Sequence, residues 1–260
     1  MRRSDFLSTD LAEAIRAHAR ACYPQEALGV ITPDGYRPME NRHPEPEQHG
    51  QYDDATMREL IATDQLLGIV HSHPNGPNAP SKPDMALQVQ LHVPAVICST
   101  NGDACLPLVV WGDMFEPDPL EGRGFIHGVT DCYELCRDWY YLEEGVRPPP
   151  VPRSWAWWNH DKHLVDELYG PSGFTRIVAE DVERGCIALC SIGRAKTPNH
   201  GLMYLGDGLV LNHCTSTGAY DPTRLSRIEP LARWVPYITR WLKPNEDRKA
   251  IWEAGEEVRR

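Results

Sequence analysis

The sequence predicts two consecutive domains, each built from helices and strands, and three observations indicate this. With 260 residues, the chain is long enough for two hydrophobic cores of ordinary size. Helix and strand patterns alternate as far as residue 111, and apolar periodicity then lapses in the proline-rich, acidic stretch Asp113–Arg123. Each side of this stretch carries its own set of chemically reactive residues at the ends of predicted elements.

Composition limits the classes of function. Apolar residues make up 41% of the chain and charged residues 24%, as in folded globular proteins. The net charge is −11 and no basic stripe is present, so we expect no nucleic-acid partner. We also expect no secretion signal and no membrane span, because no segment approaches the roughly 18 apolar residues that a span requires. Without a secretion signal, the eight cysteines are expected to be reduced thiols.

The first domain, residues 1–112, is expected to be a compact α/β unit with its site at strand ends. Its first helix is amphipathic and ends before Pro24, and its third begins after Ser81. Short apolar runs between the helices predict strands. The predicted helices are 8–23, 53–65 and 81–92, and the predicted strands are 26–31, 66–71, 94–99 and 106–111.

The second domain, residues 123–245, is expected after a linker at residues 113–122. It begins with a helix, continues through a proline-rich break and a tryptophan-rich helix, and ends with two strands around a Gly-Asp-Gly turn. The tryptophans are expected in the core, with a binding wall as the alternative. Residues 246–260 are expected to form a charged tail, either a terminal helix or a mobile end. The predicted helices are 130–142 and 155–168, and the predicted strands are 201–205 and 209–213.

The second apolar run of the first domain ends in two histidines. His71 and His73 are two residues apart, so a strand places both imidazoles on one face. Asp84 follows across a turn rich in Pro, Gly and Asn. Two imidazoles, one carboxylate and an open fourth position are typical of catalytic zinc. Glu26, where a helix gives way to a strand, is a candidate base, and Ser81 is a candidate donor to a developing oxyanion.

The same residues also have a structural interpretation. Ser81 and Asp84 match a helix capping box, in which the carboxylate binds the end of its own helix. A His-Ser-His pair on a strand can be polar surface. The combination of two same-face histidines with the box at this spacing favours the metal site.

These segments resemble the motif of the JAMM (MPN-type) metallopeptidases. The resemblance is carried by Pro24–Val30, Gly68–Pro74 and Pro80–Asp84, and it covers about residues 8–112. It implies a zinc isopeptidase or peptidase in which a bound water is the nucleophile. The family's glutamate, two histidines, serine and aspartate correspond to Glu26, His71, His73, Ser81 and Asp84, and one Zn²⁺ is implied.

The second domain begins with a candidate nucleophile. Cys132 follows Asp131 at the predicted start of a helix, where the helix dipole is expected to lower the pKa of the thiol. Such a nucleophile needs a histidine base and a group that orients it, and His200 and His213 are the candidates. If the turn between their strands has an even number of residues, His200 and His213 lie on the same face of the sheet. If it has an odd number and no bulge, they lie on opposite faces. Considered alone, Cys132 is typical of a buried cysteine in a helix. Together with His200 and His213, it favours a catalytic site.

This part of the chain resembles the NlpC-type papain-like cysteine peptidases. The resemblance is carried by Asp131-Cys132, Asn199–Gly208 and Asn212-His213, and it covers about residues 123–240. It implies a papain-like α+β domain that cleaves peptide stems of bacterial cell walls. Cys132, His200 and His213 correspond to the nucleophile, the base and the third polar residue.

The succession of the two domain types resembles the tail tip assembly proteins of lambda-like phages, and Phe125–Tyr133 and Arg137–Tyr140 fit that group. The resemblance implies a virion component, made in the host cytoplasm, that acts at the host wall. Other tail-tip proteins and peptidoglycan stem peptides are the implied partners. Two alternatives stay open: a structural tail-tip assembly factor with dispensable sites, and a cellular enzyme whose JAMM domain removes a peptide from a carrier protein.

Overall fold

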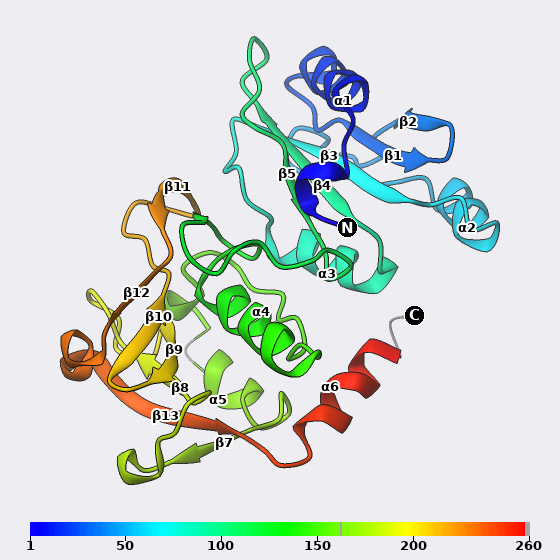
Figure 1. Ribbon diagram of the computed structural model, residues 1–260. Helices are drawn as coiled ribbons and strands as arrows, with labels where there is room; N and C mark the ends of the chain where they lie inside the picture. Colours follow the sequence, from blue (N-terminus) through cyan, green and yellow to red (C-terminus); the bar gives the residue numbers. More distant parts are fainter. Residues whose placement is uncertain (162, 258–260) are drawn as a thin grey trace. The chain divides into compact units, whose positions relative to one another are not determined.

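The computed structural model describes residues 1–161 and 163–257. The chain divides into two compact units, Met1–Glu116 and Pro117–Arg260 (Figure 1). Within the described ranges, every helix is too short or too polar to cross a lipid bilayer.

The first unit is built on a five-stranded sheet in the order β2-β1-β3-β4-β5. Only β3 and β4 run parallel, and α3 connects them, whereas the other neighbours are antiparallel. The strands are β1 (Leu28–Thr32), β2 (Gly35–Met39), β3 (Gly68–Pro74), β4 (Ala95–Thr100) and β5 (Val109–Trp111), and the helices are α1 (Thr9–Cys22), α2 (Asp54–Ala62) and α3 (Lys82–Leu91).

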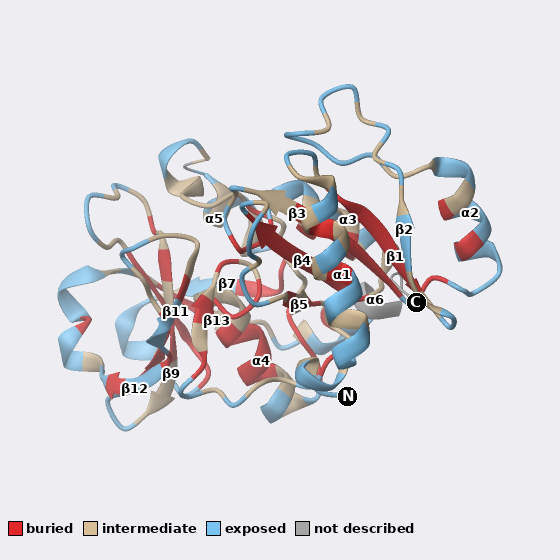
Figure 2. Ribbon diagram, turned by 90° about the horizontal axis from the view of Figure 1, so that it is seen from above, coloured by how far each residue is buried: buried red, intermediate tan, exposed pale blue. Residues whose placement is uncertain are grey.

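The core of the first unit determines which way the site residues of β3 point. Helix α1 packs Ile15 and Ala19 against Val70 and Val96, which lie on one face of the sheet. All six residues of β4 are buried, as Figure 2 shows. Because side chains alternate along a strand, the histidines on either side of Ser72 point away from the α1 face.

The second unit contains a six-stranded sheet in the order β12-β10-β9-β8-β13-β7, in which all neighbours are antiparallel, and a separate pair β11-β6. Helix α4 packs on one face of the larger sheet. The strands are β6 (Gly124–Ile126), β7 (Phe174–Ile177), β8 (Ile187–Cys190), β9 (His200–Gly206), β10 (Leu209–Asn212), β11 (Tyr220–Leu225), β12 (Arg227–Pro230) and β13 (Ile238–Pro244), and the helices are α4 (Cys132–Glu144), α5 (Leu164–Leu168) and α6 (Arg248–Glu257).

The C-terminal segment forms helix α6, the first of the two forms expected for it, and this helix contributes to the core of the second unit. Trp252 of α6 is fully buried, and its ring centroid lies 5.0 Å from that of Tyr140 and 5.8 Å from that of Phe174. Its indole N–H donates to the carbonyl of Ser172 at 2.8 Å. The sequence did not indicate that Trp252 is buried, because most of the residues around it in α6 are charged. Residues 258–260 of the expected tail lie outside the described residues.

The connection between the units is shorter than the expected linker at residues 113–122. Phe115 is buried in the first unit, with its ring 5.5 Å from that of Phe6. Leu120 packs against the core of the second unit. The sequence shows no apolar periodicity here because Phe115 and Leu120 are separated along the chain by acidic residues and prolines.

We expect residues 1–116 and 117–260 to fold as separate proteins, since each has its own core. Each fragment, expressed alone, should give a cooperative calorimetric transition that coincides with one of two transitions of the full chain. A full chain with one transition, reproduced by neither fragment, would contradict this prediction.

Candidate functional site

Two histidines and a carboxylate meet at the end of β3 in the first unit. The Nε2 atoms of His71 and His73 are 3.0 Å apart. Asp84, in the first turn of α3, places Oδ1 3.3 Å from His71 Nε2 and Oδ2 3.4 Å from His73 Nε2. These ligand atoms all lie within 4.8 Å of one another. The structure therefore brings together the three residues that the sequence analysis selected as metal ligands.

Hydrogen bonds orient this donor set. His73 Nδ1 lies 2.8 Å from the carbonyl of Pro77, an acceptor, so Nδ1 carries the proton and the Nε2 lone pair is free. Asp84 Oδ2 accepts from the amide of Ser81 at 2.7 Å, and Ser81 Oγ accepts from the amide of Asp84 at 3.3 Å. One carboxylate thus caps α3 and faces both histidines, so the capping interpretation and the metal interpretation coexist. Two imidazole nitrogens and a carboxylate oxygen are a donor set that fits Zn²⁺.

An irregular loop holds Glu26 beside this cluster. The amide of Glu26 donates to Pro46 O at 2.7 Å, and Asn41 Nδ2 donates to the carbonyl of Glu26 at 3.2 Å. At Gly50, a Cβ would lie 2.7 Å from Leu28 Cδ2 and 3.2 Å from Glu26 Oε2, so the loop approaches Glu26 more closely than a larger residue allows. Burial raises the pKa of Glu26, and the two histidines oppose this shift.

Sequence reasoning missed Asn41, whose side chain organises the loop. Its Nδ2 also donates to the carbonyls of Pro46 and His49, and its Oδ1 accepts from the amides of His43 and Gln51. An asparagine in a proline-rich segment was the only available signal, and it did not indicate which backbone groups the side chain would bind.

The second unit places Cys132 at the first position of α4. The side chain of Asp131 caps this helix by accepting from the amides of Tyr133 at 3.0 Å and Glu134 at 3.2 Å. Burial and the Asp131 carboxylate raise the pKa of the Cys132 thiol to about 12, although the backbone of Gly201 opposes the shift. This direction is opposite to the lowering expected from the helix dipole, because desolvation of the thiolate outweighs the dipole at this site.

His200, at the start of β9, is oriented by an asparagine. Its Nε2 lies 2.9 Å from Oδ1 of Asn212 on β10, and Asn212 Nδ2 donates to Glu229 Oε2 at 2.8 Å. This arrangement makes Oδ1 the end of the amide that faces the imidazole, so Nε2 carries the proton and Nδ1 is free to accept one. The ring of Trp234 lies 5.4 Å from the His200 ring. Burial lowers the pKa of His200 to about 4, although the Asn212 bond opposes this shift.

The structure does not bring His213 to His200. The β9–β10 ladder pairs Met203 with Leu211, which places Asn212 on the same face as His200 and the next residue on the opposite face. His213 Nε2 instead lies 3.0 Å from the carbonyl of Arg224. The position expected of His213 is therefore occupied by Asn212, one residue earlier. A register shift beside the turn decides the face, and residue counting could not reveal it.

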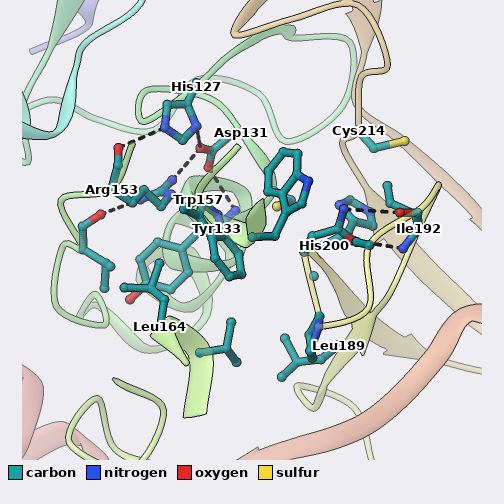
Figure 3. A pocket seen from close by; sticks show the side chains of 18 of the residues that line it. His127, Asp131, Tyr133, Arg153, Trp157, Leu164, Leu189, Ile192, His200 and Cys214 are labelled. Atoms are coloured by element: carbon teal, nitrogen blue, oxygen red, sulfur yellow. Dashed lines mark hydrogen bonds and ion pairs between the residues drawn. The ribbon is translucent and has the colours of Figure 1, made fainter. Parts of the chain in front are cut away.

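Cys132 and His200 line one cavity of about 490 Å³. In Figure 3, Tyr133 and Trp157 lie on one side of this cavity and His200 on the other. Asp131 is held at its wall by Arg153 and by His127, whose Nδ1 is 3.3 Å away.

The tryptophans expected in a core helix lie on the wall of this cavity. Residues 155–168 form a 3-10 turn at Trp157–Asn159 and the short helix α5, not one continuous helix. Trp155, Trp157 and Trp158 are each half-buried and line the cavity. The core of the unit is supplied by other aromatic residues, so these indoles remain at the site.

Comparison with known proteins supports the fold of the first unit. Residues 8–109 match the family of prokaryotic homologs of the JAB domain. This match, together with the mixed helices and strands of both units, confirms the predicted fold class.

Two solved structures are similar to part of the chain. The NlpC/p60 domain of peptidoglycan hydrolase SagA is 13% identical, with a TM-score of 0.31, over 48% of this chain and 89% of that chain. NlpC1 from Trichomonas vaginalis is 19% identical, with a TM-score of 0.31, over 47% of this chain and 41% of that chain.

Two relatives match across both units. Tail tip assembly protein K of Escherichia phage lambda is 31% identical over 196 residues, which are 74% of this chain and 85% of that protein. The protein of the same name from Escherichia phage N15 is 25% identical over 207 residues, which are 77% of this chain and 83% of that protein. The chain belongs to the family of tail tip assembly protein K.

Proposed function

We propose that this tail-tip protein is a peptidase of the phage particle whose C-terminal unit cleaves peptide stems of the host wall through Cys132. The observation that carries the proposal is the convergence of Cys132 and His200 on one cavity, with Asn212 orienting the imidazole. Cys-His-Asn is the arrangement of papain-like proteases. Other tail-tip proteins are the proposed partners, made with it in the host cytoplasm.

The geometry supports acyl transfer in two steps. His200 is neutral near pH 7 because its pKa is about 4, so Nδ1 can accept the Cys132 proton as sulfur attacks the substrate carbonyl. Asn212 accepts from Nε2–H throughout and stabilises the imidazolium. The leaving amine takes the proton from His200 and a thioester remains. His200 then accepts a proton from water, whose oxygen attacks the thioester, and returns the proton to the departing Cys132 sulfur.

The start of α4 can also stabilise the oxyanion. Asp131 accepts from the amides of Tyr133 and Glu134, but its carboxylate does not take the amide N–H of Cys132. That N–H lies at the positive end of the helix dipole, next to the attacking sulfur, where negative charge develops on the substrate oxygen. The same helix end therefore favours the tetrahedral intermediate, even though burial and the Asp131 carboxylate raise the pKa of the Cys132 thiol.

For the N-terminal unit we propose a zinc-dependent isopeptidase or peptidase site. His71, His73 and Asp84 would hold the ion, which supplies Lewis acidity and a water of lowered pKa when bound. Glu26, whose pKa burial raises, would accept and return the proton. Ser81 Oγ already accepts a hydrogen bond from the Asp84 amide, so its own O–H is free to donate to substrate.

A second candidate function is structural. Both relatives are named for tail-tip assembly, which favours a role in which the protein contributes to the particle and its sites are dispensable. The same relatives count against a cellular enzyme that processes a carrier protein. A phage that carries Cys132→Ala and His73→Ala separates the two roles: an assembly factor forms infectious particles without these side chains, whereas a required peptidase gives particles that fail at entry.

We expect Cys132→Ala to abolish cleavage of defined muropeptides, and a metal chelator to leave it intact, because the thiol site needs no metal. His200→Ala should be nearly as damaging, and Asn212→Ala should slow turnover roughly 10- to 100-fold, because triad members act as a unit. His213→Gln is the matched control and should change the rate less than about threefold, within the effect of a lost neutral hydrogen bond. Product formation is measured by liquid chromatography and mass spectrometry.

The opposite pattern would assign cleavage to the wrong unit. If Cys132→Ala still cleaves while a chelator abolishes activity, the zinc site performs the reaction. If His213→Gln is as damaging as Asn212→Ala, the orientation of His200 does not depend on the asparagine.

We expect native protein to contain about one zinc per chain and His73→Ala to lose it, because three ligands are the minimum of a catalytic site. His43→Ala, which removes a histidine of the neighbouring loop, is the matched control and should keep its zinc. Elemental analysis by mass spectrometry after gel filtration gives the ratio. Stoichiometric zinc in His73→Ala would show that this residue is not a ligand.

A further inference from the structure

One buried carboxylate lies behind the cysteine site and collects four hydrogen bonds. Glu229 is on β12, an edge strand, yet only 4% of it is exposed. Its Oε2 accepts from Asn212 Nδ2 at 2.8 Å and from Trp234 Nε1 at 3.0 Å. Its Oε1 accepts from Arg227 Nε at 2.8 Å and from Arg233 Nη1 at 3.1 Å.

The two donors on Oε2 are the two side chains that surround the imidazole of His200. Asn212 Oδ1 lies 2.9 Å from His200 Nε2, and the Trp234 ring stands 5.4 Å from the imidazole at an interplanar angle of 39°. A single carboxylate oxygen therefore holds both the amide that orients the base and the indole that shields it from water.

The side chain that accepts from Asn212 Nδ2 must be a carboxylate to fix the orientation of the Asn212 amide. An asparagine amide can present either its oxygen or its NH₂ group to a neighbour, and only the oxygen can accept from His200 Nε2–H. An ionised carboxylate has no donor, so it binds the NH₂ end and excludes the flipped amide. A glutamine at this position could rotate and present its own NH₂ group, which would tolerate either orientation.

Burying this charge would be costly if its only purpose were to pair β12 with β10. A buried carboxylate loses several kcal/mol of hydration, and an apolar side chain at an edge strand avoids that loss. Arg227 and Arg233 offset part of it, and the pKa of Glu229 stays below its usual value, although burial opposes this. The other titratable groups that influence the His200 imidazole electrostatically are Asp131 and His213.

We propose that Glu229 is a positioning residue of the cysteine site: its carboxylate fixes the Asn212 amide and the Trp234 ring, and through them the Nε2–H tautomer of His200. The inference rests on the proposed function of Cys132. It adds a fourth residue to the site, on a strand that contributes none of the residues lining the cavity.

The test uses the full chain with Glu229→Leu, which removes both charge and acceptor, and Glu229→Gln, which keeps the shape. Glu143→Gln is the matched control, because Glu143 accepts two hydrogen bonds from Arg184 away from the site. Imidazole ¹⁵N shifts of His200 give the tautomer. The rate of Cys132 alkylation by iodoacetamide, read from the Cys132 peptide by mass spectrometry, gives the competence of the base without a substrate.

Wild type should have one tautomer, with the proton on Nε2. Glu229→Leu should populate both tautomers and alkylate at least about 10-fold more slowly, as expected when a charge-assisted hydrogen bond that orients a base is lost. Glu229→Gln should lie between Glu229→Leu and wild type. Glu143→Gln should match wild type, although its melting temperature can fall.

A folded Glu229→Leu with the wild-type tautomer and rate would overturn the proposal. If this variant does not fold, Glu229→Gln decides, and identity with wild type in both measurements overturns it. A wild type that alkylates Cys132 no faster than His200→Ala would instead remove the proposed function, and the inference with it. The two failures are thus distinguishable.

Discussion

The carboxylate of Asp131 is the interaction on which the second unit depends. It accepts from the amides of Gly128, Tyr133 and Glu134 and forms an ion pair with Arg153. Loss of an N-cap alone costs about 0.5–2 kcal/mol, and breaking a buried ion pair costs about 3–5 kcal/mol. Without Asp131, Arg153 keeps the longer contact of 3.7 Å with Glu134. The second effect dominates, so Asp131 does more than start a helix. It fixes the loop and helix end that present Cys132 to the cavity.

This arrangement determines how the thiol can react. The dipole of α4 favours a thiolate, but burial and the adjacent Asp131 carboxylate disfavour it, and the pKa of Cys132 rises to about 12. In the proposed reaction this balance favours a neutral thiol that transfers its proton to His200 during attack, rather than a preformed ion pair. The low pKa of His200 agrees with this, because an imidazole that resists protonation at rest is available as a base at neutral pH.

The first site could be predicted from the sequence because its ligands are close along the chain. His71 and His73 need only the two-residue period of a strand, and Asp84 needs only the capping box that begins α3. The loop that holds Glu26 could not be predicted, because the partners of Asn41 are backbone groups set by the folded loop. Asn212 was missed for a related reason: the register of β9 and β10 shifts beside their turn, and one residue of shift exchanges the two faces of a strand. Trp252 was missed because one buried side chain in a charged helix leaves no periodic signal.

The two sites therefore differ in how they depend on folding. The candidate metal ligands lie within residues 71–84, on a strand and the helix that follows it, so a small part of the unit is enough to bring them together. Cys132, His200, Asn212 and Glu229 come from α4, β9, β10 and β12, so the site requires the β9–β10 hairpin, the pairing of β10 with β12 and the packing of α4 on the sheet. Long-range pairing of this kind carries a large loop-closure cost that must be met before any contact is gained. An imidazole with a fixed tautomer at His200 is consequently a stricter indicator of the native second unit than its secondary structure is, because it requires the sheet register, the turn and the edge strand to be correct together.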